Sequence, residues 1–257
     1  MKLVVDIGNT NIVFGIKNKG KWEKIWRFET DKTSDALDYS IRINNILWEA
    51  GIHPNDIQHK ILSTVVPDLL DTFKEVLEKL NSKPVIVLDK KIYPLLDLQI
   101  LNPNEIGSDL VSNAIAAHRI YPENIIIIDF GTALTFTVLN KEGKILGVNI
   151  APGLKTAIHV LGDKTAQLDV VPLEIPDNVL GQDTKTAIQN GVLLGYIGLI
   201  SHMIQTIKQQ IGNNYKVLAT GGLSSVLKPK LPQIDYFNKE LTLEGLAILP
   251  EIIAKKQ

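Results

Sequence analysis

The pattern of apolar and polar residues at the start of the chain is typical of a β-hairpin. An apolar run ends in Asp6, small turn residues follow from Gly8 to Asn11, and a second β-prone run covers residues 12–16. Gly8 lets the backbone approach a ligand closely, and a turn of this kind can direct several amides at a phosphate. A plain hairpin with a capped turn fits this stretch equally well.

The same order of residues recurs in residues 125–139. An apolar strand precedes Asp129 as another precedes Asp6, and Gly131 stands where Gly8 stands in the first copy. The two copies are separated by nearly half the length of the 257-residue chain. Such internal repetition predicts a duplicated domain.

Strand and helix patterns alternate along the rest of the chain, which predicts an α/β fold with mixed sheets. Strands are expected at residues 22–28, 60–66, 84–89, 145–151 and 217–220, the last of which ends in Gly221-Gly222. Helices are expected at residues 34–50 with Ser34 as the cap, and at 68–80, 110–120, 154–161, 184–212 and 243–253, with Pro250 bending or ending the last.

Composition narrows the possible partners and locations. The net charge of −1 and the absence of charge runs argue against a nucleic-acid or membrane partner. The absence of cysteine excludes disulfides, cysteine-based zinc sites and thiol nucleophiles, and the five histidines show no ligand spacing. With no signal peptide and no long apolar run, a cytoplasmic protein is expected.

One acidic residue lies at the start of a predicted helix. Gly107 and Ser108 form a turn, and Asp109 follows directly before an apolar helix face. Local sequence alone favours Asp109 as a helix cap or a first-turn acid that the helix dipole stabilises. A chemical role for this carboxylate is the alternative.

Two hairpins with phosphate-binding turns, followed by a strand that ends in a glycine pair, resemble the actin, hexokinase and Hsp70 superfamily. That resemblance implies two similar actin-like (ribonuclease H-like) domains, each a mixed sheet flanked by helices, which bind ATP between them. The expected domains are residues 1–117, with the phosphate-binding hairpin, and residues 118–257.

A series of motifs makes the resemblance more specific. In chain order they are DIGNTN from Asp6, GSD from Gly107 before a helix with Asn113 and Ala116-Ala117, DFGTA from Asp129, APG from Ala151, the pair Thr165-Ala166, and GQDT from Gly181. Together they look like type III pantothenate kinase over essentially the whole chain. The resemblance implies phosphorylation of pantothenate to 4′-phosphopantothenate, the first step of coenzyme A biosynthesis, by a homodimer with its active site at the interface.

The resemblance also implies roles for individual residues and cofactors. Asp109 matches the general base, and Asp129 matches the ligand of a monovalent cation, K⁺ or NH₄⁺. ATP with Mg²⁺ is implied. Asp6 is a candidate Mg²⁺ ligand, because a single carboxylate at the end of a strand can hold a Mg²⁺ ion that keeps most of its water ligands. Expected ATP contacts are Asp6, Ile7, Gly8, Asn9, Thr10, Asn11, Ile12, Val13 and Thr132. Expected substrate contacts are Gly107, Ser108, Asp109, Leu110 and Thr184, with Thr184 reaching across the dimer.

The sequence departs from the family pattern at four positions. Leu110 stands in place of an arginine, Ile100 in place of a tyrosine, Thr137 in place of an aspartate, and Val148 in place of a glycine. Leucine and isoleucine side chains offer no hydrogen bonds, so the pocket is expected to be more apolar than is usual in the family. A kinase for another small alcohol, or a nucleotide-binding regulator with little activity, are the alternative interpretations.

Overall fold

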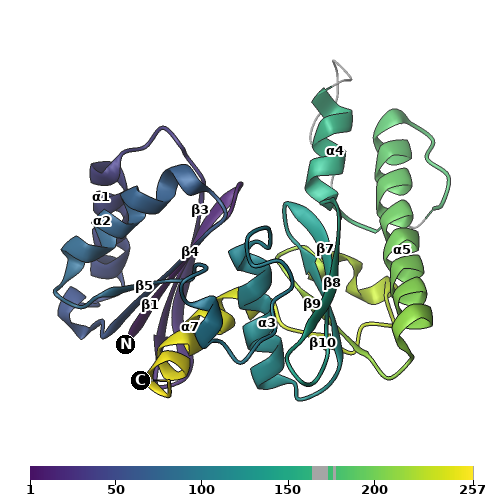
Figure 1. Cartoon of the computed structure of the whole chain (residues 1–257). Coiled ribbons are helices and arrows are strands. Elements are labelled where there is room, and N and C mark those ends of the chain that lie inside the picture. Colours follow the sequence, from purple (N-terminus) through teal and green to yellow (C-terminus); the bar gives the residue numbers. More distant parts are fainter. Residues whose placement is uncertain (164–172, 176–177, 257) are drawn as a thin grey trace. The chain divides into compact units, whose positions relative to one another are not determined.

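The computed structural model describes residues 1–163, 173–175 and 178–256, and these form two compact units (Figure 1). Unit 1 comprises Met1–Ile120 and Leu241–Gln257, and unit 2 comprises Tyr121–Glu240. Each unit contains its own five-stranded sheet. The chain therefore leaves unit 1 after residue 120 and returns to it for its C-terminal helix.

Unit 1 has a mixed sheet in the order β3-β2-β1-β4-β5. The strands are β1 (Lys2–Ile7), β2 (Asn11–Asn18), β3 (Lys21–Glu29), β4 (His59–Thr64) and β5 (Val85–Val87). β1 pairs antiparallel with β2 and parallel with β4, and Asp6 is the register partner of Ser63. The carboxyl ends of β1 and β4 therefore lie side by side, at the turn that the sequence singled out.

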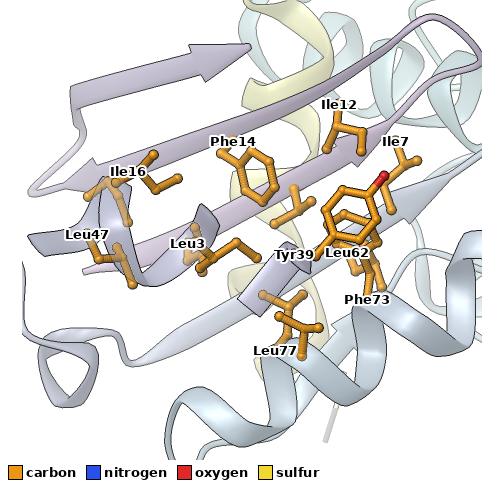
Figure 2. Close-up of a cluster of buried hydrophobic side chains, with 14 of the residues drawn as sticks. Leu3, Ile7, Ile12, Phe14, Ile16, Tyr39, Leu47, Leu62, Phe73 and Leu77 are labelled. Atoms are coloured by element: carbon orange, nitrogen blue, oxygen red, sulfur yellow. The ribbon is translucent and has the colours of Figure 1, made fainter. Parts of the chain in front are cut away.

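One face of this sheet packs against α1 (Ala36–Glu49) and α2 (Leu70–Leu80). Leu3 and Ile7 of β1 and Leu62 of β4 point into this layer, where they meet Tyr39 and Phe73 of the two helices (Figure 2). Alternate residues of a strand face the same side, so one set of apolar positions forms this core. Each fully buried side chain of this kind contributes about 1.5–3 kcal/mol to the free energy of unfolding.

The other face of the sheet packs against α3 (Ser108–Ile120) and α7 (Leu241–Ala254). The two helices cross closely at Gly245, because a Cβ atom there would overlap the backbone oxygen of Ser112. The Ser112 hydroxyl donates to the Thr242 carbonyl oxygen at 2.7 Å, and the Thr242 hydroxyl donates to Asn113 Oδ1 at 2.8 Å. Close packing and buried hydrogen bonds together fix α7 against α3.

Unit 2 repeats the plan with the strand order β10-β9-β6-β7-β8. Its strands are β6 (Ile125–Phe130), β7 (Ala133–Leu139), β8 (Ile145–Pro152), β9 (Lys216–Thr220) and β10 (Tyr236–Phe237). Ile126, Ile128 and Phe130 face the layer of α4 (Leu154–Asp163) and α5 (Thr184–Ile211). The short helix α6 (Ser224–Leu227) follows β9.

Helix α5 is long and apolar enough to cross a membrane by length and composition, and it is the one such helix in the described part of the chain. A core helix passes the same test. The apolar residues Leu193, Ile200 and Ile204 of α5 are buried in the core of unit 2, which accounts for part of this apolar character.

The two sheets and their helices confirm the predicted fold class, and both predicted hairpins form, as β1-β2 and β6-β7. One cap differs from the prediction. Asp35, rather than Ser34, caps α1, and its carboxylate accepts from the amides of Leu37 and Asp38 at 2.8 and 2.9 Å. The Ser34 hydroxyl instead donates to Asp31 at 2.8 Å, so it is not available to the helix.

Two prolines bear on further differences between the predicted and the observed helix ends. Pro67–Leu69 form a 3₁₀ turn ahead of α2, so the helix starts later than the expected residue 68. Pro250 lies inside α7 without ending it, since the helix continues to Ala254. The compact units also differ from the expected division after residue 117, because α7 packs on α3 and belongs to unit 1.

Candidate active site

The turn between β1 and β2 is held by backbone hydrogen bonds. The Gly8 amide donates to the Asn11 carbonyl oxygen at 2.9 Å, and the Thr30 hydroxyl donates to the Gly8 carbonyl oxygen at 2.6 Å. Asn9 and Thr10 are exposed at the tip, whereas the side chains of Ile7, Ile12 and Val13 are buried in the core. Among the predicted ATP contacts, these three can therefore offer a ligand only their backbone.

Asp6 and the start of α3 lie on the same face of the unit 1 sheet. Val4 and Ile61, two residues before Asp6 and Ser63, face α3 and α7. Because side chains alternate along a strand, Asp6 and Ser63 face that side as well. The Ser63 and Ser108 hydroxyl oxygens are 3.0 Å apart, and Ser108 also donates to the Thr64 carbonyl oxygen at 3.0 Å. The sheet thus holds the first residue of α3 beside the carboxyl end of β1.

Asp109 occupies the first turn of α3. The Val111 amide donates to the Gly107 carbonyl oxygen at 3.2 Å, so Gly107 rather than Asp109 takes the cap position. Asp109 Oδ1 accepts from the Leu110 amide at 2.8 Å, and a Cβ atom on Gly107 would overlap this oxygen. Burial raises the pKa of the Asp109 carboxyl above its ordinary value.

The residues around Asp109 are largely apolar. Leu110 is buried, and Ile100 and Ile106 are half-buried against the cluster that includes Val111. The two predicted departures in unit 1, Leu110 and Ile100, therefore present hydrocarbon where the family pattern has arginine and tyrosine.

The second set of predicted site residues belongs to unit 2, where Asp129 ends β6. Ile128 and Phe130 face the helices, so Asp129 faces the opposite side of the sheet. Its register partners are Thr135 on β7 and Thr220 on β9. Gly221, with φ of +88°, passes so close that a Cβ atom would lie 2.7 Å from Asp129 Oδ1. Only glycine fits this backbone conformation at this distance.

Two further predicted residues of unit 2 lie in the β6-β7 turn and at the start of α5. The carbonyl oxygen of exposed Thr132 accepts from the Gly153 amide at 3.0 Å and from the Thr156 hydroxyl at 2.8 Å, which ties the second turn to α4. Thr184 is the first residue of α5 and is exposed. Asp183 caps α5 by accepting from the Thr186 amide at 2.8 Å, and hydrogen bonds from Thr186 lower the pKa of Asp183.

The other departures also lie in unit 2. Thr137 is buried and Val148 is half-buried. Thr165-Ala166, one of the motifs that carries the resemblance, lies outside the described residues.

The donor atoms present fit hard cations better than transition metals. The described residues contain no group of three or more histidine, aspartate or glutamate side chains that could hold a metal. A Mg²⁺ ion commonly uses one or two carboxylates together with phosphate and water, which Asp6 can satisfy. Thr135 Oγ1 is buried without a hydrogen-bond partner, across the strand pair from Asp129. A carboxylate and an unpaired hydroxyl oxygen on neighbouring strands suit a monovalent cation.

A family model described as Type III pantothenate kinase matches residues 2–206. The match covers most of the chain and includes the β1-β2 turn, Asp109, Asp129 and Thr184. The chain belongs to the type III pantothenate kinase family. This family assignment identifies the protein as a kinase, and so as a transferase.

Solved structures share the fold with this pantothenate kinase family member at low sequence identity. A Campylobacter jejuni protein described as a conserved Baf family transcriptional activator is 20% identical, with a TM-score of 0.61 over 99% of this chain and 98% of the other. The activator of 2-hydroxyisocaproyl-CoA dehydratase from Clostridium difficile, with bound ADPNP, is 13% identical, with a TM-score of 0.57 over 99% and 96%. Component A of (R)-2-hydroxyglutaryl-CoA dehydratase from Acidaminococcus fermentans is 12% identical, with a TM-score of 0.58 over 98% of each chain. These matches show the actin-like ATPase fold.

The sequence did not single out Ser63, whose hydroxyl lies beside that of Ser108 at the start of α3. Ser63 is a buried polar residue that directly follows the apolar pair Ile61 and Leu62 in β4, and the sequence carries no other signal of its contact with Ser108.

Proposed function

We propose that this protein transfers the γ-phosphoryl group of ATP to pantothenate and produces 4′-phosphopantothenate for coenzyme A biosynthesis. Membership of the type III pantothenate kinase family supports the reaction class. The observation that carries the proposal is in unit 1, where Asp109 opens α3 on the sheet face that also bears Asp6. The Ser63–Ser108 hydrogen bond of 3.0 Å fixes that arrangement.

Asp109 is the proposed general base. The acceptor hydroxyl gives its proton to the Asp109 carboxylate while its oxygen attacks the γ-phosphorus, and ADP leaves with the former bridging oxygen. Burial raises the pKa of Asp109, which makes its carboxylate a better proton acceptor than an exposed aspartate. Apart from this proton transfer, phosphoryl transfer depends on positioning the two reactants and on neutralising the charge of the phosphates. The proposed mechanism therefore uses Asp109 as its one base.

The β1-β2 turn is the proposed phosphate site, covering Asp6 to Val13. Gly8 and its neighbours up to Asn11 supply backbone amides and polar side chains, whereas Ile7, Ile12 and Val13 hold the turn on the core. Thr132, exposed on the equivalent turn of unit 2, is the proposed further nucleotide contact. Gly107, Ser108, Leu110 and Thr184 are the proposed substrate contacts.

Two cations complete the proposed site. Asp6 would hold Mg²⁺, which neutralises charge on the phosphates of ATP. Asp129 would hold K⁺ or NH₄⁺, and the unpaired Thr135 hydroxyl supports an oxygen-lined site at this position.

A homodimer in the cytoplasm is the proposed form of the enzyme, with Thr184 reaching the partner's substrate. Unit 2 carries exposed apolar residues that support an interface, notably Leu146 and Ile150, which are 38% and 69% exposed on β8. β8 is an edge strand of the unit 2 sheet, so one of its sides has no neighbouring strand among the described residues.

A coupled assay of ADP release tests the proposal, with pantothenate and a panel of other small alcohols as acceptors. We expect release that requires ATP, Mg²⁺ and pantothenate together. ADP release with pantothenate no faster than the background without an acceptor would contradict the proposal.

A second candidate is a divergent homologue that phosphorylates a different small alcohol, or that binds nucleotide as a regulator with little activity. Buried Leu110 and half-buried Ile100 favour it, because they lack the polar groups of the family pattern. If the unmodified protein shows no turnover with pantothenate, the double variant Leu110→Arg, Ile100→Tyr should gain it. No gain would favour this second candidate.

A further inference from the structure

A pocket of about 360 Å³ lies in unit 2, at the end of the sheet opposite to Asp129. It is lined by the segments that lead into β6 and β9, by the β7-β8 turn and by the last turn of α5. β6 and β9 run parallel, with Ile125 paired to Lys216 at their starts and Asp129 paired to Thr220 near their ends. Because a strand rises about 3.3 Å per residue, roughly 13 Å of β6 separates Ile125 from Asp129. The pocket is therefore distinct from the proposed cation site.

Hydrogen bonds between neighbouring segments hold the walls of this pocket together. The Lys216 amide donates to the Asn124 carbonyl oxygen at 2.9 Å, and the Lys141 amide donates to Asn124 Oδ1 at 2.9 Å. The Val217 amide donates to Asp235 Oδ2 at 2.8 Å. The pocket is thus formed by the chain itself, and a preformed site loses less affinity to the ordering of its side chains and loops.

The carboxylates of the pocket already have partners within the chain. Asp235 Oδ1 accepts from Lys216 Nζ at 2.9 Å, while its other oxygen accepts from the Val217 amide. Glu123 Oε1 accepts from the Tyr236 hydroxyl at 3.1 Å. The acceptor groups that line the pocket are therefore largely used.

Several donors that line the same pocket are not used. Lys208 is half-buried, and its ammonium group makes no hydrogen bond or ion pair with another described residue. The Lys141 ammonium has only its sequence neighbour Glu142, at 3.9 Å, and both of these side chains are more than half exposed, so the pair is weak. Asn124 Nδ2 also has no partner in the described part of the chain. Two ammonium groups and one amide thus remain for a ligand.

A phosphate group is the ligand that matches these donors. It carries about −1.5 to −2 charge at neutral pH and has three strong acceptor oxygens, and the three donors come from three different segments. A carboxylate has one charge and two oxygens, so it would leave a donor unused. We propose that this pocket is a second anion site of the protein, which binds a small molecule through a phosphate group held by Lys141, Lys208 and Asn124. The site takes no part in phosphoryl transfer.

Titration of the whole protein with inorganic phosphate tests this site. In two-dimensional NMR of ¹⁵N-labelled protein, the backbone amides of Lys141 and Lys216 should shift in a saturable manner at constant ionic strength. The amides of the β1-β2 turn report separately on phosphate at the proposed ATP site. Lys208→Met removes the donor and should weaken binding at the pocket roughly tenfold or more, as expected for one lost hydrogen bond to a charged group.

Lys230→Met is the matched control. Lys230 is an exposed lysine of unit 2 that does not line the pocket, so this variant should keep the dissociation constant for phosphate. Glycerol 3-phosphate, as a second ligand, distinguishes two sources of the phosphate group. Tighter binding of glycerol 3-phosphate than of inorganic phosphate would assign the pocket to a phosphorylated metabolite, and the reverse order would assign it to free phosphate.

Three results would overturn the proposal. One is the absence of a saturable shift of the Lys141 and Lys216 amides with either ligand. Another is an unchanged dissociation constant in both Lys208→Met and Lys141→Met. The third is equal weakening in Lys208→Met and Lys230→Met, because phosphate would then act through general electrostatic screening.

Discussion

The hydroxyl oxygens of Ser63 and Ser108 lie 3.0 Å apart and join the end of strand β4 to the first residue of helix α3. Both residues are buried. Since Asp109 follows Ser108 directly, this hydrogen bond fixes the proposed base relative to the sheet that carries Asp6. Positioning of this kind contributes to catalysis more than it contributes to stability.

Ser63→Ala should therefore lower turnover more than it lowers stability. We expect a loss of about 0.5–1.5 kcal/mol in the free energy of unfolding, as for one ordinary hydrogen bond. Turnover should fall by at least tenfold. Ser112→Ala is the control, because it removes a buried hydrogen bond one turn further along α3. Equal turnover in both variants, measured by ADP release and urea unfolding, would contradict a positioning role for Ser63.

Asp109→Asn separates a general base from a helix residue. The side chain accepts a hydrogen bond from the Leu110 amide, which asparagine can largely preserve. Loss of the proton acceptor should cost roughly 10²–10⁴-fold in turnover. We expect a folded, dimeric variant that still binds ATP, as measured by fluorescence titration with a nucleotide analogue. A variant that keeps more than half of the turnover would show that Asp109 is not the base.

The same variant should be more stable than the unmodified protein at neutral pH. Burial raises the pKa of Asp109, so the folded state holds the proton more tightly than the unfolded state does. The free energy of unfolding therefore falls as pH rises from the unfolded to the folded pKa, and the asparagine variant escapes that loss. The extra stability of the asparagine variant should disappear in acid, below both the folded-state and the unfolded-state pKa of Asp109. Urea unfolding at several pH values would show this.

K⁺ should stabilise the protein through Asp129. At a K⁺ concentration about ten times the dissociation constant, mass action gives about 1.4 kcal/mol of stabilisation over a large organic cation. Asp129→Asn should abolish this difference, and activity should also fall when K⁺ is replaced. Asp235→Asn is the control, because it breaks a 2.9 Å ion pair with Lys216 elsewhere in unit 2. This variant should still be more stable in K⁺ than in the large organic cation. Identical melting curves in both salts would count against a cation at Asp129.

Ile150→Lys should weaken the proposed dimer. The side chain is exposed on the edge strand β8, and a charge there would have to be desolvated in an apolar interface. Ile41→Lys is the control, because Ile41 is 50% exposed on α1 in unit 1. Sedimentation should show a monomer for Ile150→Lys and a dimer for the control. A fully active, monomeric unmodified protein at micromolar concentration would contradict the dimer itself.

Much of the fold could be predicted from the sequence because strand signals are local. The runs before Asp6 and Asp129 are short, apolar and bounded by small turn residues, so both hairpins were visible. Their spacing also indicated the duplication. What the sequence could not show was the place of α7, because its packing on α3 depends on Gly245 and Ser112, which are far apart in the chain.

The proposed site was predictable only where it coincides with a turn or a helix start. Gly8 and Asp109 stand at such positions, and the motif resemblance drew attention to them. The contact between Ser63 and Ser108 depends on how β4 and α3 pack together. No periodicity in the sequence encodes contacts of that kind.

The discontinuity of unit 1 affects the order in which the chain can fold during translation. Strands β1 to β5 and α3 leave the ribosome first, but α7, which covers Val4 and Ile61, follows only after all of unit 2 has been made. Unit 2 is continuous, so its core can close while unit 1 still waits for α7. Proteins usually fold their N-terminal part first during synthesis, and here we expect the reverse. A nascent chain stalled before Leu241 should then expose unit 1, rather than unit 2, to proteases and chaperones.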